Sequence, residues 1–93
     1  MENLFALSGG VLVTGGTRGI GRAISLRFAR AGASVIANYV RDQKAADDLK
    51  TTADREGLPI QLCRADVTTP QGLEQIERSI PNSHILPSCI IFV

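Results

Sequence analysis

A cluster of glycines near the N-terminus is the feature of this sequence that could do chemistry. Four of the residues 15–21 are glycine, and the cluster follows a short apolar run at residues 11–13. Glycine lets the chain turn sharply and lets a ligand come close to the main chain. The first free amides of a helix that starts near Gly19 would attract anionic oxygen atoms, helped by the helix dipole. The segment therefore predicts a loop that binds a phosphate or diphosphate group.

Phosphate-binding loops differ in the residues that follow their glycines. The loop of nucleoside triphosphatases has the pattern G-x-x-x-x-G-K-[ST], but here Arg22 and Ala23 follow Gly21, so the lysine and the magnesium-binding hydroxyl are missing. The common dinucleotide pattern G-x-G-x-x-G is missing too, because Ile24 stands where its third glycine would be. The pattern present is G-x-x-x-G-x-G. A glycine-rich turn without a ligand is the alternative.

The segments around the glycine cluster alternate between strand and helix. Ile20, Ala23, Ile24 and Phe28 have helical spacing and predict the apolar face of the first helix, which Gly32 would end. The alternation predicts an α/β layer fold with right-handed crossovers. The other expected elements are strands at 11–13, 33–39, 60–65 and 88–93, a helix from the cap Asp42 to Glu56, and a helix that starts at Thr69 and Pro70 with Leu73, Ile76 and Ile80 on its apolar face.

Three marks together resemble the short-chain dehydrogenase/reductase family. They are the sequence TGGTRGIG at 14–21, Asn38 and Tyr39 with nearby Arg41 after the second strand, and Asp66 and Val67 after the third. The stretch from Leu7 to Ile80 is similar to the N-terminal cofactor-binding half of this family, and most similar to its bacterial 3-oxoacyl-[acyl-carrier-protein] reductases. The resemblance implies a partial Rossmann-type, doubly wound parallel sheet, βαβαβα plus a C-terminal strand, in the order 3-2-1-4. We expect residues 1–93 to form a single, incomplete NADP-binding domain with an atypical tail at 81–93.

The choice between NADP and NAD depends on charges near the end of the second strand. An NAD site places Asp or Glu there to bind both ribose hydroxyls, whereas this chain has Asn38 and no carboxylate before Asp42. Arg18 and Arg41 could flank a 2′-phosphate with charge-assisted hydrogen bonds. The resemblance implies the same for Arg18, which stands just before Gly19. We expect NADP(H), and the alternative is that both arginines are ordinary solvated charges.

The adenosine end of the cofactor supplies the remaining expected contacts. The resemblance implies that the Asp66 side chain meets the adenine amino group, and that the main chain of Val67 lies beside the ring. Asp66 could equally organise the turn that follows it. The expected cofactor-binding residues are Gly15, Thr17, Arg18, Gly19, Ile20, Gly21, Asn38, Tyr39, Arg41, Asp66 and Val67.

A catalytic set is missing from the sequence. The resemblance implies a Tyr-x-x-x-Lys pair with a Ser and an Asn, which move a proton while hydride passes between nicotinamide and a carbonyl carbon. The one tyrosine, Tyr39, has Gln43 four positions later, and no lysine follows Lys50. We assign no catalytic residue and no metal ligand. We expect an NADP(H)-binding fragment of an oxidoreductase, truncated or frame-shifted after Ile80, with its catalytic half absent.

Two other hypotheses remain open at this point. The chain could be a non-catalytic nucleotide-binding or interaction module, which pairs with a partner chain or with a second copy of itself over the exposed sheet. It could also be an active enzyme whose catalytic half comes from another polypeptide. A Tyr-x-x-x-Lys protein bound to the chain would distinguish the second hypothesis from the first.

Composition excludes several other classes of function. The 93 residues carry ten Lys plus Arg and nine Asp plus Glu, and this balance indicates neither nucleic acid nor an anionic membrane surface as a partner. The apolar end at 85–93 is far shorter than the roughly 20 residues that span a bilayer. The first residues, 1–7, contain no Lys or Arg, unlike a signal peptide. The two separate cysteines, Cys63 and Cys89, favour a reducing cytoplasm.

Overall fold

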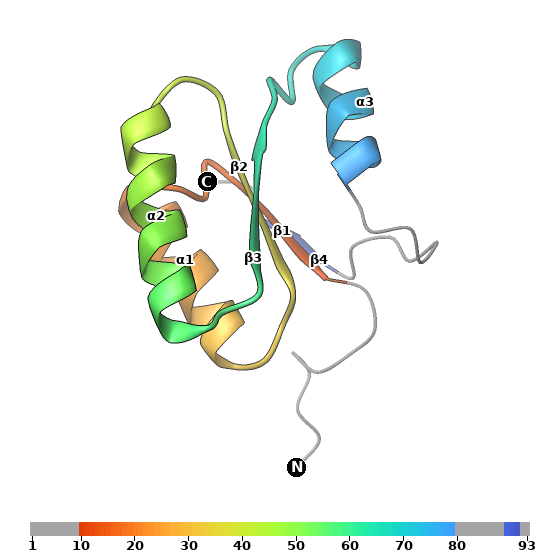
Figure 1. Ribbon diagram of the computed structural model, residues 1–93. Helices are drawn as coiled ribbons and strands as arrows, with labels where there is room; N and C mark the ends of the chain where they lie inside the picture. Colours follow the sequence, from red (N-terminus) through yellow and green to blue (C-terminus); the bar gives the residue numbers. More distant parts are fainter. Residues whose placement is uncertain (1–9, 80–88, 92–93) are drawn as a thin grey trace.

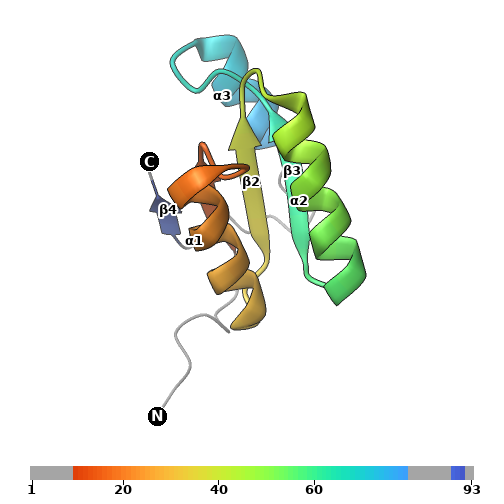
Figure 2. The same cartoon turned by 90° about the vertical axis from the view of Figure 1, so that its left-hand side faces the viewer.

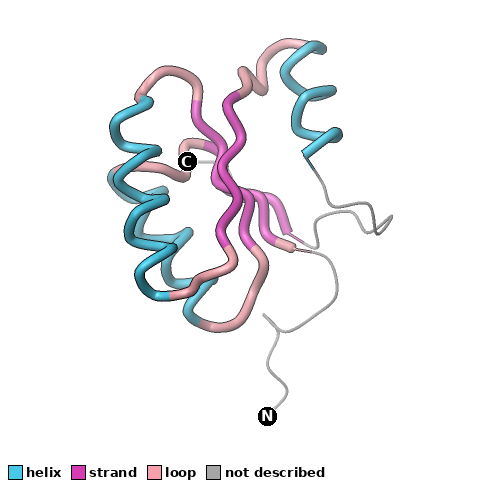
Figure 3. Tube along the Cα trace, in the orientation of Figure 1, coloured by secondary structure: helices cyan, strands magenta, loops and turns pink. Residues whose placement is uncertain are grey.

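Two buried segments, 11–14 and 35–39, form the centre of a parallel sheet. The computed structural model describes residues 10–79 and 89–91, whose strands pair in the order β3-β2-β1-β4 (Figures 1 and 3). The predicted order 3-2-1-4 is confirmed. The elements are β1 (Val11–Thr14), α1 (Gly19–Arg30), β2 (Val35–Tyr39), α2 (Gln43–Glu56), β3 (Ile60–Arg64), α3 (Pro70–Ser79) and β4 (Cys89–Ile91).

Burial along the strands follows their place in the sheet. Every residue of β1 and β2 is buried, as expected of parallel strands covered on both faces. The edge strand β3 has both buried and exposed residues, but they do not alternate strictly as the sequence predicted. Val11, Val13, Val35 and Ala37 lie in one apolar cluster with residues of α1 and α2. The opposite face holds a second cluster that includes Leu12, Ile36, Cys63 and Ile76. The sheet is therefore the middle of three layers.

The helices are divided between the two faces of the sheet. Figure 1 shows α1 and α2 on one side of the sheet and α3 on the other. Because β1, β2 and β3 are parallel, the loops that follow them lie together at one end of the sheet, the upper end in Figure 2. This is the end at which open α/β sheets bind ligands.

The buried face of α1 differs from the predicted one. Gly21, Ser25, Leu26 and Ala29 are the buried residues of this helix. Ile20, which the prediction placed on the apolar face, is 72% exposed. The small side chains of the buried face let the helix lie close to the sheet, so the larger apolar residues at Ile24 and Phe28 pack only partly, at the edge of the cluster. Ala23 is also exposed.

The caps that begin the second and third helices, and the end of the second helix at Glu56, are confirmed. Asp42 Oδ1 accepts a hydrogen bond of 3.0 Å from the Ala45 amide, and Gly57 ends α2 in the left-handed conformation at φ 68°. Thr69 Oγ1 accepts 2.9 Å from the Gly72 amide and starts α3. The predicted face of α3 is only partly right, because Ile76 is buried but Leu73 is 57% exposed. Ile80 lies outside the described residues.

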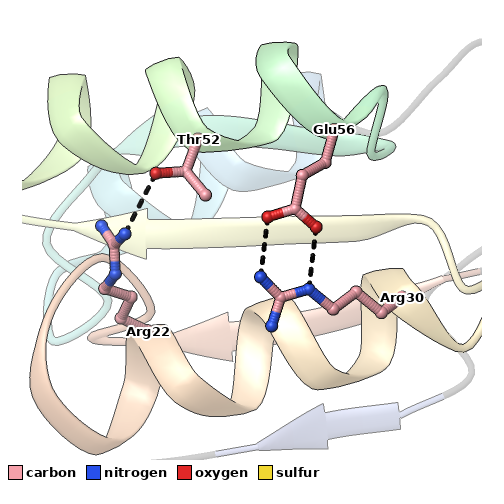
Figure 4. Close-up of polar contacts among 4 residues, drawn as sticks. All are labelled: Arg22, Arg30, Thr52 and Glu56. Carbon is pink, nitrogen blue, oxygen red and sulfur yellow. Dashed lines mark hydrogen bonds and ion pairs between the residues drawn. The ribbon is translucent and has the colours of Figure 1, made fainter.

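Two arginines of α1 join it to α2. Figure 4 shows Arg30 paired with the Glu56 carboxylate through two hydrogen bonds, of 2.9 and 2.7 Å, and Arg22 donating 3.1 Å to Thr52 Oγ1. The Glu56 hydrogen bond raises the pKa of Arg30, and the Arg30 hydrogen bond lowers the pKa of Glu56. These contacts fix the spacing of the two helices whose N-termini face the site.

The predicted atypical tail falls mostly outside the described residues. Its described part, β4, pairs in parallel with β1, and Thr14 Oγ1 donates 3.3 Å to the Ile91 carbonyl. The predicted C-terminal strand is therefore present over Cys89–Ile91. Across residues 10–79 and 89–91, no helix has the length and apolar character needed to cross a membrane.

Candidate functional site

The glycine loop connects the end of β1 to the start of α1. Gly15 and Gly19 have φ values of 64° and 56°, in the left-handed region that glycine adopts at no steric cost. Arg18, between them, is extended and stands at the N-cap of α1. A β-carbon on Gly19 would have no protein atom within 4 Å, so it would project into the open space in front of the loop. The loop thus leaves its outer side clear for a ligand.

The inner side of the loop is held by the rest of the fold. The Gly16 amide donates 2.9 Å to the Asn38 carbonyl, and the buried Ser25 hydroxyl donates 2.9 Å to the Gly16 carbonyl. A β-carbon on Gly21 would overlap the carbonyl oxygen of Gly15. Thr17 is 2% exposed. These contacts order the loop without using the amides that begin the helix.

The N-terminus of α1 differs from those of the other two helices. Its N-cap residue, Arg18, makes no side-chain capping hydrogen bond. By contrast, Asp42 caps α2 and Thr69 caps α3. Uncapped amides at a helix N-terminus, with the positive end of the helix dipole behind them, suit an anionic group. Gly19 and Ile20 are exposed, so this end of the helix is accessible.

The two expected phosphate-binding arginines lie at the same end of the sheet, but Arg18 has a partner. Its Nη1 lies 3.1 Å from Oδ2 of Asp42, with side chains 74% and 39% exposed. In the sequence Asp42 stands beyond the end of the second strand, and the fold brings its carboxylate to Arg18 of the glycine loop. Arg41, the preceding residue, is exposed.

Neighbouring residues of the fold hold the side chains of Asn38 and Tyr39. Its side chain is 2% exposed, and Nδ2 donates 2.8 Å to the Ala65 carbonyl and 3.2 Å to the Cys63 carbonyl. The amide therefore joins the end of β2 to the end of β3 and the residue that follows it. The Tyr39 side chain is also buried, at 9% exposure, and its hydroxyl donates 2.9 Å to Gln43 Oε1. Both residues act here as supports for the loops.

Asp66 organises the turn after β3, which was one of the two roles considered for it. Oδ1 accepts from the Thr68 amide at 2.9 Å and from the Thr68 hydroxyl at 2.6 Å. These hydrogen bonds, with a smaller effect of the positive charge of Arg41, lower the pKa of the exposed Asp66 carboxyl. Both bonds end on Oδ1, so Oδ2 remains outside them. Val67 is half-buried against the second apolar cluster.

Several residues that shape the site were not identified from the sequence. The hydrogen bond from Ser25 to the Gly16 carbonyl anchors the glycine loop. In the turn after β3, Gly72 is needed because a β-carbon there would overlap the Asp66 carbonyl oxygen. A serine on the buried face of a helix was the available signal for Ser25. The pairing of Asp42 with Arg18 spans 24 residues, and no local pattern shows it.

The remaining surface near the loop is a shallow groove along α1. It encloses about 360 Å³ and is lined by Gly19, Arg22, Ala23, Leu26, Arg27 and Arg30. Two of its arginines, Arg22 and Arg30, are engaged with α2. Among the described residues, no three His, Cys, Asp or Glu side chains come together as a metal ion would require.

Comparison with known proteins agrees with this geometry. The sequence pattern of the short chain dehydrogenase family matches residues 10–84. An L-rhamnose 1-dehydrogenase (NADP(+)) of Thermoplasma acidophilum is 37% identical over 70 residues, which are 74% of this chain and 28% of that protein. A short-chain dehydrogenase/reductase homolog of Bacillus subtilis, YusS, is 36% identical over 73 residues, which are 78% of this chain and 67% of that protein.

Solved structures give the same result. The crystal structure of gox2181 superposes with a TM-score of 0.68 at 32% identity, covering 81% of this chain and 29% of the other. A dehydrogenase/reductase from Sinorhizobium meliloti gives 0.68 at 34% identity, covering 81% and 30%. Among the relatives found by sequence, a short-chain type dehydrogenase/reductase of Picea abies is 37% identical, and the match covers 26% of its length. The chain therefore spans about a quarter of the length of such relatives. The relatives carry names of varied activities. From the glycine loop, the strand order and these similarities, the chain belongs to the short-chain dehydrogenase/reductase family and corresponds to its N-terminal portion.

Proposed function

We propose that this chain is the NADP(H)-binding part of a short-chain dehydrogenase/reductase-type oxidoreductase. The observation that carries the proposal is the N-terminus of α1. It follows a loop with two left-handed glycines, and it has no side-chain cap where α2 and α3 have one. A diphosphate would supply the acceptors that this helix end lacks.

The described residues fit a dinucleotide along the end of the sheet. The amides of Gly19, Ile20 and Gly21 would receive the diphosphate, and the main chain at Gly15 and Thr17 would border it. At the adenosine end, Asp66 would use Oδ2 toward the adenine amino group, because Oδ1 is engaged with Thr68. Val67 would lie beside the ring, as the family resemblance implies.

The preference for NADP over NAD rests on charge. Arg18 and Arg41 place two positive charges at the ends of the loops after β1 and β2, where a 2′-phosphate would lie. Asn38 and Tyr39, which we expected to contact the cofactor, would contribute through the loops they support, because their side chains are buried. NADP(+) also stands in the name of the Thermoplasma relative.

The parent activity that we propose is hydride transfer between NADPH and a carbonyl carbon, as in the 3-oxoacyl-[acyl-carrier-protein] reductases that the sequence resembles. The bound nicotinamide would supply or accept the hydride. The residues of this chain bind and orient the cofactor, and none of them is assigned to proton transfer. The catalytic groups would come from further protein of a different sequence, because a second copy of this chain lacks them too. A second copy or a partner chain could cover the exposed sheet. The buried Cys63, which forms no disulfide, is compatible with the cytoplasmic location that we propose.

Titrations of the chain with NADPH, NADH and ATP, each measured by calorimetry, test the proposal. We expect saturable binding of NADPH that exceeds binding of NADH and ATP. Replacing Arg18 with alanine should weaken NADPH binding about tenfold, in line with the loss of one charge-assisted contact. Arg78→Ala is the matched control, because Arg78 is an exposed arginine of α3 that pairs with Glu74. Equal and weak binding of all three nucleotides would contradict the proposal.

A further inference from the structure

We infer that Asp42 is a specificity-determining residue of the nucleotide site, because its carboxylate holds Arg18 and competes with the 2′-phosphate of NADP(H) for that charge. The inference rests on the proposed function. It goes beyond it by naming a residue that limits the preference for the phosphorylated cofactor.

The geometry fixes the carboxylate of Asp42 in place. Oδ1 accepts 3.0 Å from the Ala45 amide as the cap of α2, and Oδ2 lies 3.1 Å from Nη1 of Arg18. An aspartate that only paired with Arg18 could rotate away when a competing anion arrived. The capping bond holds this one at the helix N-terminus, where the dipole also favours a negative charge.

The charged side chains around Asp42 determine the net charge that the ribose end of a nucleotide would face. Arg18 and Arg41 supply two positive charges, and Asp42 offsets one of them. The positive charge of Arg41 also acts on the Asp66 carboxyl, where it contributes to lowering the pKa. A 2′-phosphate would have to take Arg18 from Asp42 or lie beside a negative charge. A 2′-hydroxyl carries no charge and could donate a hydrogen bond to the same carboxylate, as the acidic residue of an NAD site does.

The capping role and the competing role of Asp42 can be separated by substitution. Asparagine and serine cap helices about as well as aspartate but carry no charge. If Asp42 serves only as a cap, Asp42→Asn and Asp42→Ser leave nucleotide selectivity unchanged. If it competes for Arg18, both variants raise the affinity for NADPH and leave the affinity for NADH unchanged or lower.

Calorimetric titration of the full chain with NADPH and NADH tests the inference, with circular dichroism to verify that each variant is folded. We expect NADPH affinity to rise about two- to fivefold in both Asp42 variants, the scale of one partly exposed charge contact. Asp54→Asn is the matched control: it removes one negative charge from the same helix, where Asp54 pairs with Lys50, and should change affinity less than about twofold. The gain in NADPH affinity should be smaller when Asp42→Asn is introduced into a chain that already carries Arg18→Ala. Asp42 and the 2′-phosphate then have no arginine to compete for.

The outcomes separate this inference from the proposed function. Saturable NADPH binding by the parent chain, with the same NADPH-to-NADH ratio in Asp42→Asn and Asp42→Ser, would overturn the inference and leave the proposed function intact. No saturable binding of either nucleotide by the folded parent chain would overturn both. A gain of equal size in Asp54→Asn would assign the effect to net charge and would also overturn the role of Asp42.

Discussion

The first turn of α1 lies so close to the loop before it that a β-carbon on Gly21 would overlap the carbonyl oxygen of Gly15. This approach brings the uncapped end of the helix against the left-handed turn at Gly15, whose φ is 64°. Loop and helix start therefore form one unit, and a larger residue at Gly21 has to push them apart.

Gly21→Ala should destabilise the fold and weaken nucleotide binding together. The added methyl group meets main-chain atoms, which cannot move aside as a flexible side chain can. Overpacking of this kind costs about 1–3 kcal/mol in free energy of unfolding. Urea unfolding followed by circular dichroism measures the loss.

Gly19→Ala provides the comparison for Gly21→Ala. A β-carbon at Gly19 meets no protein atom within 4 Å, so the cost is only that of the left-handed conformation at φ 56°, about 1–2 kcal/mol. Its main effect should be on nucleotide affinity, because the methyl group enters the space where the diphosphate is proposed to lie. Unfolding free energies that fell more in Gly19→Ala than in Gly21→Ala would contradict the packing described.

Ser25→Ala should loosen the glycine loop from α1. The Ser25 hydroxyl is fully buried and donates 2.9 Å to the Gly16 carbonyl, so its removal leaves a buried acceptor without that donor. The expected cost is about 1–3 kcal/mol, measured as a shift in the urea midpoint. Thr51→Ala removes an exposed hydroxyl that bonds to the Asp47 carbonyl, and should cost far less. Equal shifts in the two variants would show that the anchor has no special role.

Asn38→Asp is the change that would mimic an NAD site at the end of β2. It should destabilise the fold without changing the preference between NADPH and NADH. The buried Nδ2 donates to the carbonyls of Cys63 and Ala65, and a carboxylate there would face two acceptors. We expect a loss of at least about 2 kcal/mol, with an aspartate pKa above its ordinary range. Gln71→Glu, the same chemical change on an exposed position of α3, is the control. A folded Asn38→Asp variant that prefers NADH would contradict this assignment.

Acidification should release the turn after β3. The pKa of Asp66 lies below its ordinary value of 3.8, chiefly through the Thr68 hydroxyl. Because the pKa is lower in the folded state, the ionised carboxyl stabilises the fold at pH values above its ordinary pKa. This stabilisation is lost as the pH falls through the pKa of the folded state. Thr68→Val removes the hydroxyl but keeps the amide, so the Asp66 pKa should rise toward 3.8. Carbon-13 chemical shifts of the Asp66 carboxyl against pH measure this, and an unchanged midpoint would refute it.

Most of the fold could be predicted because its signals are local. The glycine loop, the caps at Asp42 and Thr69 and the stop at Gly57 each depend on a few neighbouring residues. The strand order followed from the family resemblance and was confirmed. The buried face of α1 was predicted wrongly, because large apolar residues such as Ile20 were preferred over the small ones that let the helix approach the sheet.

The parts of the site that were missed depend on partners far along the chain. Asn38 was predicted as a cofactor contact, and the hydrogen bonds of its amide to carbonyls 25 and 27 residues away were not predicted. Asp42 was identified as a cap, while its contact with Arg18 arises only when two strands pair side by side. Residue type and spacing indicate which groups can bind, whereas the register of the sheet decides which of them are already occupied.

Nuclear magnetic resonance of the nitrogen-15-labelled chain, titrated with NADPH, tests the central claim most directly. The amide signals of Gly19, Ile20 and Gly21 should move and saturate with the nucleotide, because these amides are proposed to receive the diphosphate. The amides of Ala45 and Gly72, which already donate to their own caps, should move much less. Saturable binding of NADPH that left the three amides at the start of α1 unmoved would contradict the account.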